Sequence, residues 1–253
     1  MMKKIALIVL LAVLPLLSWG QGKVYTKKAR MEDFEKHTTK VVVSGESLLA
    51  ITLREEIMSR WRISPFEFCT PEEYNSIKTN NNLFFINLIV DNDVAFLSLT
   101  RGGKDDSDML HRPFEIVRIP FAADGASTGQ EFSFLGAIID VMQHFTEDAM
   151  SSDIIGYASL SNYSQSNLKG KTVYLSPGDA DKAMTEGTHN AVCGLIITPV
   201  TLSKKCFSYR MLISADTHEL YYFEQERFNA PEDRYFSEAE AKSFEKRNGV
   251  VVR

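Results

Sequence analysis

The chain is poor in the residues that most chemical motifs need. Its three cysteines, Cys69, Cys193 and Cys206, are an odd number, which leaves at least one thiol unpaired in a monomer. A Cys193–Cys206 bridge is one pairing that the sequence allows, but buried free thiols are the favoured prediction. None of the five histidines has the four-residue spacing of a zinc-binding helix. The dinucleotide-binding pattern G-x-G-x-x-G is also missing, so we predict no metal site and no cofactor.

Basic charge is in deficit as well. Lys and Arg number 28 against 33 Asp and Glu, which gives a formal net charge of −5 at pH 7. The acidic excess grows further if Lys3 and Lys4 are removed with a leader. Nucleic acids and anionic lipid surfaces are bound through basic side chains, and no basic stripe is visible here. The sequence therefore predicts no nucleic-acid partner.

Long apolar runs are missing after residue 20. At the N-terminus, Lys3 and Lys4 precede the apolar run Ile5–Leu17, and the small residues Ser18 and Gly20 come just before Gln21. This pattern is typical of a signal peptide, residues 1–20, that is cleaved before Gln21. The run is too short to cross a bilayer comfortably. We expect a soluble protein without a membrane span, exported to the periplasm or the extracellular space.

What the chain does contain is a clear strand and helix pattern, and residues 40–78 show it best. Lys40–Val43 is a β-branched run typical of a buried strand. Apolar residues then recur every three or four positions from Leu49 to Trp61, which predicts a helix with Trp61 closing its buried face. A short strand at Phe66–Phe68 follows, and Thr70-Pro71 is a typical start of a second helix.

The rest of the chain continues in the same style. The expected strands are Leu83–Val90, Val94–Thr100, Pro113–Phe121, Thr172–Leu175, Ala191–Pro199, Cys206–Ser214 and Glu219–Glu226. The first of these is almost continuously apolar, which predicts a strand covered on both faces. The expected helices are Ser133–Met150, residues 176–185 and a segment from Ser237. After a polar leader at residues 21–39, we predict one α/β to α+β domain over residues 40–253. It holds a mixed β-sheet with helices packed on it and a C-terminal antiparallel meander. Residues 151–169 mark the place of any subdivision.

One motif points to catalysis. Residues 125–129 match the G-x-S-x-G pattern, in which a serine nucleophile, here Ser127, lies on a sharp strand-to-helix turn. Asp179 or Asp216 and His189 or His218 would supply its partners. The predicted strand and helix lie too far apart for such a turn, so a flexible loop is the favoured interpretation.

Two further motifs have simpler interpretations. Gly170-Lys171-Thr172 resembles the end of a phosphate-binding loop, but the first glycine of that loop is absent and a strand follows instead of a helix. The acidic stretch Asp105–Asp108 lacks the central glycine and the closing glutamate of a calcium loop. We interpret it as a solvated loop.

The chain also resembles a known type of protein. The features that carry this resemblance are a short leader before Gln21, the strand at Thr38–Val43, Trp61, the stretch Pro65–Phe68 and Glu73-Tyr74. With them the chain is similar to uncharacterised exported proteins of Bacteroidetes-type bacteria. The resemblance implies export and brings no activity and no site residues. By analogy, the alternation of strands and helices is also compatible with periplasmic α/β domains that dock other envelope proteins.

The sequence favours a non-enzymatic function over catalysis. We expect an exported soluble protein that binds an envelope protein or a small ligand, with no catalytic residue assigned. A serine hydrolase built on Ser127 is the alternative, and a purely structural subunit of an envelope assembly is a third hypothesis. A concave pocket with converging polar groups would favour a ligand.

Overall fold

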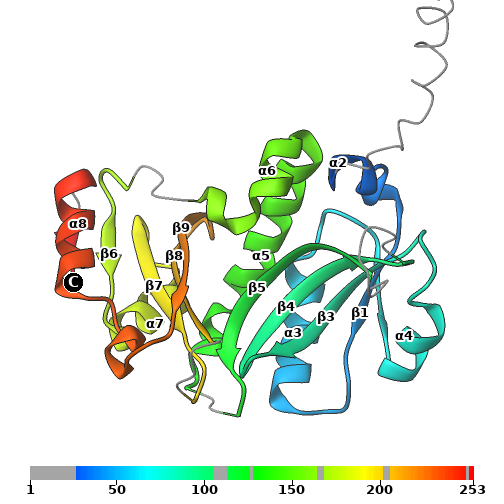
Figure 1. Cartoon of the computed structure of the whole chain (residues 1–253), viewed down its shortest axis with the longest axis horizontal. Helices are drawn as coiled ribbons and strands as arrows, with labels where there is room; N and C mark the ends of the chain where they lie inside the picture. The colour runs from blue at the N-terminus through cyan, green and yellow to red at the C-terminus, as the bar shows by residue number, and fades with distance from the viewer. Residues whose placement is uncertain (1–26, 105–112, 126–127, 164–167, 202–205, 249–250) are drawn as a thin grey trace, which may run out of the picture.

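The computed structural model of the protein describes residues 27–104, 113–125, 128–163, 168–201, 206–248 and 251–253. In these residues the strands form two mixed five-stranded sheets, and helices pack on them (Figure 1). The predicted α/β to α+β class is confirmed, although the strands divide between two sheets. The predicted signal peptide, the acidic stretch Asp105–Asp108 and Ser127 lie outside the described residues.

The first sheet contains β1 to β5. Its strands are β1 (Thr39–Val42), β2 (Phe66–Cys69), β3 (Phe84–Asp91), β4 (Val94–Arg101) and β5 (Phe114–Ala123), in the order β2-β1-β3-β4-β5. Strand β1 runs parallel to β2 and β3, and β3, β4 and β5 are antiparallel neighbours. The predicted β3–β4 hairpin is present, but β3 is not buried throughout, since Leu88 and Val90 near its end are 37% and 58% exposed.

Helices α3 (Leu48–Arg60) and α4 (Pro71–Ile77) belong to the same half. Ser47 Oγ accepts a hydrogen bond from Ala50 N at 3.2 Å, which caps the start of α3. The predicted threonine cap of α4 is also present. Trp61 follows α3 and is 2% exposed, as predicted, with its Nε1 donating to Ser64 Oγ at 3.0 Å.

The segment before β1 contributes to the core. It contains α2 (Lys27–Arg30) and the 3-10 turn η2 (Phe34–Lys36), and both Met31 and Phe34 are fully buried. Phe34 packs edge to face on Phe84, with ring centroids 4.6 Å apart. The residues expected to form a polar leader are therefore ordered from residue 27 onward by two apolar side chains.

The second sheet repeats the pairing pattern of the first, although its edge strand β10 is the last strand of the chain, whereas the corresponding β2 is the second. Its strands are β6 (Thr172–Tyr174), β7 (Ala191–Ile197), β8 (Phe207–Ser214), β9 (Leu220–Arg227) and β10 (Val251–Val252), in the order β10-β6-β7-β8-β9. Strand β6 is parallel to both β10 and β7, as β1 is to β2 and β3. The predicted meander β7–β8–β9 is antiparallel, within a sheet that is mixed.

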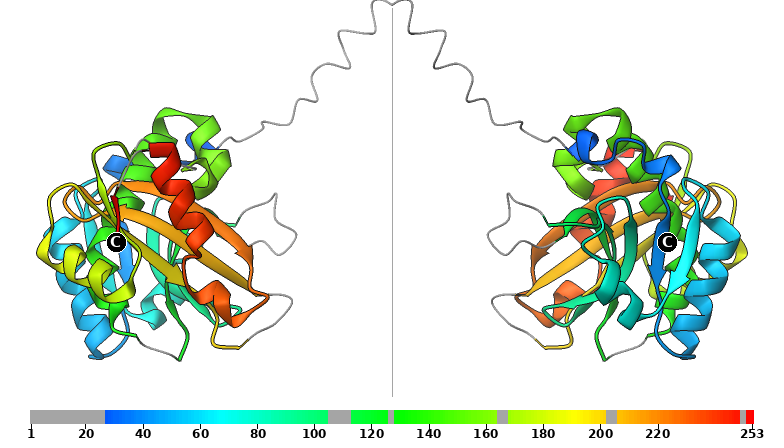
Figure 2. Two further views of the ribbon diagram at one scale, coloured as in Figure 1. Left: turned by 90° about the vertical axis from the view of Figure 1, so that its left-hand side faces the viewer. Right: turned by 90° about the vertical axis from the view of Figure 1, so that its right-hand side faces the viewer.

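In the described part of the chain, four helices after β5 join and cover the two sheets. They are α5 (Gln130–Ser151), which lies between the sheets, α6 (Asp153–Ala158), α7 (Pro177–Glu186) and α8 (Glu238–Asn248), with 3-10 turns η3 (Ser159–Asn162) and η4 (Pro231–Arg234) (Figure 1). Figure 2 shows α8 lying across the outer face of the second sheet. One hydrophobic cluster holds residues of both sheets, and Phe96 of β4 packs edge to face on Tyr209 of β8.

Two other predictions concern the chemistry of the whole chain. Cys69, Cys193 and Cys206 are all buried and free, which agrees with the favoured prediction. Within the described ranges, no helix combines the length and the apolar character needed to cross a bilayer.

Candidate functional site

A cleft of about 440 Å³ opens beside the start of α7, and we call it the α7 cleft. Its size falls in the range of about 300–1,000 Å³ that is usual for small-molecule sites. It is lined by Ala123, Thr128, Gln130, Pro177, Gly178, Asp181, Ile196, Thr198, Pro199, Val200, Arg234 and Tyr235. These residues come from the end of β5, the starts of α5 and α7, the end of β7 and the turn η4, so both halves of the molecule contribute to it.

The cleft exists because β6 is shorter than its neighbour β7. Strand β6 pairs with β7 only as far as Tyr174 opposite Cys193, whereas β7 continues to Ile197. On its other side β7 pairs with β8 along its whole length. Among the described residues, the edge of β7 beyond Gly194 therefore has no strand partner on the side of β6, and Ile196 lines the cleft.

Two apolar side chains at the rim of the cleft are open to solvent. Val200 is 47% exposed and Tyr235 is 64% exposed, and both line the cleft. Single exposed apolar residues are common on protein surfaces. Two of them in one concave site provide apolar contact area for a bound molecule.

The Asp181 carboxylate lines the cleft and has acceptor capacity to spare. Its Oδ1 atom is buried and has no hydrogen-bond partner among the described residues. Buried polar atoms are normally satisfied, so such an atom calls for an explanation. The carboxylate also lies close to the Cys193 thiol: burial raises the pKa of that thiol to about 12, and the negative charge of Asp181 contributes to the increase. A ligand that carries hydrogen-bond donors would satisfy this carboxylate.

Arg234 brings positive charge to the same cleft. Its Nη2 donates to Val200 O at 2.8 Å, and its guanidinium lies over the Phe228 ring, 5.5 Å from the centroid. The turn η4 that carries Arg234 is fixed by the buried Arg210, whose Nη2 donates to Asp233 O at 3.2 Å. No ion pair joins Arg234 to Asp181, so both charges remain available to a ligand.

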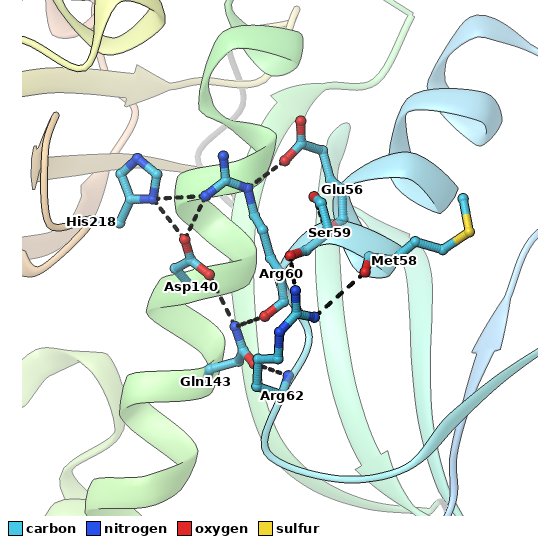
Figure 3. Close-up of polar contacts among 8 residues, drawn as sticks. All are labelled: Glu56, Met58, Ser59, Arg60, Arg62, Asp140, Gln143 and His218. Carbon is cyan, nitrogen blue, oxygen red and sulfur yellow. Dashed lines mark hydrogen bonds and ion pairs between the residues drawn. The ribbon is translucent and has the colours of Figure 1, made fainter.

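A second polar cluster joins the two halves of the molecule. We call it the polar junction, and Figure 3 shows its members Glu56 and Arg60 of α3, Asp140 and Gln143 of α5, and His218 of the β8–β9 turn. Arg60 bonds Glu56 through Nε at 2.5 Å and Asp140 through Nη1 at 2.9 Å. Gln143 Nε2 donates to both Asp140 Oδ1 and Arg60 O. The junction thus ties α3 and the second sheet to α5.

Asp140 is the acceptor at the centre of the polar junction. His218 Nδ1 lies 2.7 Å from Asp140 Oδ2, and because an ionised carboxylate only accepts, that nitrogen carries the proton. The 3.4 Å approach of Arg60 Nη1 to the same nitrogen is then a contact between two donors. Desolvation raises the pKa of Asp140, but the His218 hydrogen bond and the charge of Arg60 outweigh it and hold that pKa below its ordinary value.

The structure also places the proposed partners of Ser127. Its described neighbours Thr128 and Gln130 lie at the start of α5 and beside the start of α7, where Gln130 Nε2 donates to Pro177 O at 3.2 Å. His189 follows the far end of α7, and ten helical residues span about 15 Å.

The histidines also have other partners. His189 Nδ1 lies 2.9 Å from Asp216 Oδ2, and His218 is occupied by Asp140. Ser214 Oγ donates to Asp216 Oδ1 at 2.6 Å and not to a histidine, so these residues form no nucleophile–base pair. Asp179, the other acidic candidate, lies in the first turn of α7.

Other chemistries lack a constellation among the residues that the structure describes. No group of three or more His, Cys, Asp and Glu side chains is placed to hold a metal. Thr172 begins β6 and not a helix, in agreement with the rejection of a phosphate-binding loop. A second cleft of about 330 Å³ is lined by Glu147, Asp148 and Glu219, but Tyr163 and Tyr221 donate to two of these carboxylates.

Sequence reasoning did not find the residues of the α7 cleft. Asp181, Val200, Arg234 and Tyr235 lie in separate segments, and no local pattern connects them. The one available signal was the unequal length of two predicted strands, Thr172–Leu175 and Ala191–Pro199. Comparison of this chain with models of known protein families, with curated proteins and with solved structures finds no match.

Proposed function

We propose that this protein is a non-enzymatic binding protein that holds a small ligand in the α7 cleft. The α7 cleft itself carries the proposal, because two exposed apolar side chains, an unsatisfied carboxylate and an arginine converge in one concave site. Such a combination of apolar walls with a few polar groups is usual for ligand sites. A small ligand is favoured over an envelope protein because these features lie within a cleft and not on a flat surface.

Native mass spectrometry of protein purified without unfolding tests the proposal. The expected result is a non-covalent adduct that the Val200→Glu variant loses, since a carboxylate at the rim disfavours apolar contact. Ile154→Glu is the matched control, because Ile154 is also apolar, is 78% exposed, and lies on α6 beyond the C-terminal end of α5, whereas the cleft lies at the start of α5. An adduct that survives Val200→Glu, or the lack of any adduct, would remove the support for a ligand in this cleft.

Export belongs to the same proposal. Lys3, Lys4, the apolar run Ile5–Leu17 and the small residues before Gln21 support it, together with the resemblance to exported proteins. Intact-mass measurement of the protein from its native host should place the N-terminus at or near Gln21. A chain that retains Met1 in the cell interior would contradict export.

The alternative function, a serine hydrolase, has weaker support. The histidine–aspartate pair at His189 and Asp216 is the feature in its favour, but this pair lies at the end of α7 remote from Thr128. A fluorophosphonate probe should therefore leave the protein unlabelled. Labelling that disappears in Ser127→Ala would replace the binding function by hydrolysis.

A further inference from the structure

We propose that the ligand of the α7 cleft is a short extended peptide with a free ammonium and a free carboxylate group. The peptide pairs with the open edge of β7 and presents its opposite charges to Asp181 and Arg234. This inference rests on the proposed function and adds the chemical class of the ligand.

The edge of β7 is the first observation. Because β8 occupies only one side of β7, the backbone N–H and C=O of Ile196 point toward the side that β6 leaves open, whereas Gly194 is buried against Leu175 and Phe236. An edge of this kind is a template for another strand. An extended peptide supplies the complementary backbone groups, which is the established mode of strand addition.

The charges are the second observation. Asp181 and Arg234 line the same cleft without pairing with each other, and Asp181 Oδ1 has no hydrogen-bond partner in the part of the chain that the structure describes. A ligand with only a cation would leave Arg234 unused, and a ligand with only an anion would be repelled by Asp181. A peptide with free ends carries one charge of each sign, so it matches the site in charge as well as in backbone.

Size and apolar contact complete the match. A volume of about 440 Å³ corresponds to roughly fifteen water molecules at ~30 Å³ each, which is the space that a dipeptide or a short tripeptide needs. Val200 and Tyr235 at the rim offer apolar surface for one or two side chains. The expected preference is therefore for small apolar peptides.

Calorimetric titration with the tripeptide Leu-Ala-Leu tests this assignment. The unmodified peptide should bind, whereas its N-acetylated form and its C-terminal amide should each bind at least tenfold more weakly. A tenfold loss corresponds to about 1.4 kcal/mol, within the usual strength of a charge-assisted hydrogen bond. A peptide methylated at its central backbone nitrogen should also bind more weakly, because it cannot complete the strand pairing.

Matched variants assign the two charges. Asp181→Asn should bind the free and the acetylated peptide equally, and Arg234→Gln should bind the free and the amidated peptide equally. Asp179→Asn and Lys182→Gln are the controls on α7, since neither residue lines the cleft, and both should keep the full preference for free ends. Thermal unfolding of each variant without peptide checks that its fold is retained.

Equal affinity of the wild type for free and capped peptides would overturn the inference, and so would the absence of binding. If the peptides fail while Val200→Glu still removes the native adduct, the ligand belongs to another chemical class and the proposed function stands. If both experiments fail, the proposed function falls as well.

Discussion

Among single residues, Trp61 contributes most to the core beneath the first sheet. Its ring is 2% exposed, contacts Phe34 edge to face, and satisfies its only donor through Ser64. Truncation of a buried tryptophan leaves a cavity and costs about 3–5 kcal/mol, against a total stability of about 5–15 kcal/mol. We therefore expect Trp61→Ala to lower the midpoint of thermal unfolding strongly. Glu55→Ala on the exposed face of α3 should have little effect, and equal small effects would contradict the packing.

Asp140 gives the polar junction a dependence on pH. Its pKa in the folded protein lies below the ordinary value, so its contribution to stability is present above about pH 4 and is lost as the pH falls through the folded-state pKa. From pH 6 to about pH 4, the free energy of unfolding of the wild-type protein should exceed that of the Asp140→Asn variant by a constant amount, about 1–3 kcal/mol.

Below about pH 4 this difference should shrink toward zero, as urea denaturation at a series of pH values can measure. Glu147→Gln is the control, because Glu147 is exposed two turns further along α5. A difference that grows on acidification would have the wrong sign for a carboxylate stabilised by Arg60 and His218.

Sequence reasoning at this scale succeeded where one residue type acts locally. Trp61 was predicted to be buried because it completes a helical stripe, and Thr70 was predicted to cap a helix because it precedes Pro71. The partners of Asp140 and the residues around Asp181 come from segments distant in sequence. Only the folded chain brings such residues together, so composition and spacing could not reveal them.

At the scale of elements, α5 is the helix on which the rest depends. It lies between the sheets and carries Asp140 and Gln143, and its Gly136 leaves room for the side-chain ends of Arg60 and Glu56. A Cβ atom at Gly136 would lie 2.6 Å from both Arg60 Nε and Glu56 Oε2, and those atoms would have to move. The absence of a side chain at Gly136 is therefore part of the geometry of the polar junction.

Gly136→Ala should destabilise the protein, although alanine is favoured over glycine in helices by about 1 kcal/mol. The net cost should be small, below about 1 kcal/mol, because the displaced atoms are the ends of the flexible Arg60 and Glu56 side chains. In a Glu56→Ala/Arg60→Ala background the same change should become neutral or stabilising, which a double-mutant cycle can measure. Gly178→Ala is the control, since no atom lies within 4 Å of its added Cβ. Stabilisation by Gly136→Ala in the wild type would contradict the close approach.

Most elements were predicted within a few residues, and the differences have local causes. Helix α5 begins at Gln130, earlier than the expected Ser133, because Gly129 adopts a left-handed conformation and ends the loop. The loop from β5 to α5 is therefore six residues, 124–129, shorter than the expected spacing. Helix α6 and the two-residue strand β10 were missed, since neither is long enough to show a period.

At the scale of the whole molecule, the two sheets behave as parts of one core. They share the same pattern of strand pairing, but one hydrophobic cluster includes Val41 and Leu99 of the first sheet and Leu195 and Met211 of the second. The polar junction adds contacts between them. The division of the strands into two sheets could not be predicted, because strand order depends on contacts between distant segments.

The shared core predicts a single cooperative unfolding transition. In urea, fluorescence of Trp61 in the first half and reactivity of the buried Cys193 thiol in the second should change at the same midpoint. Labelled peptides analysed by mass spectrometry identify Cys193 without any substitution. Two separated midpoints would mean that the halves unfold independently and that the contacts between Phe96 and Tyr209 are weak.

The central claim is that the α7 cleft holds a ligand. X-ray diffraction from crystals of protein that carries the native adduct tests it most directly. The account predicts electron density for an extended molecule along the edge of β7, between Asp181 and Arg234 and in contact with Val200 and Tyr235. Density for the adduct elsewhere, with only ordered water in the α7 cleft, would contradict it.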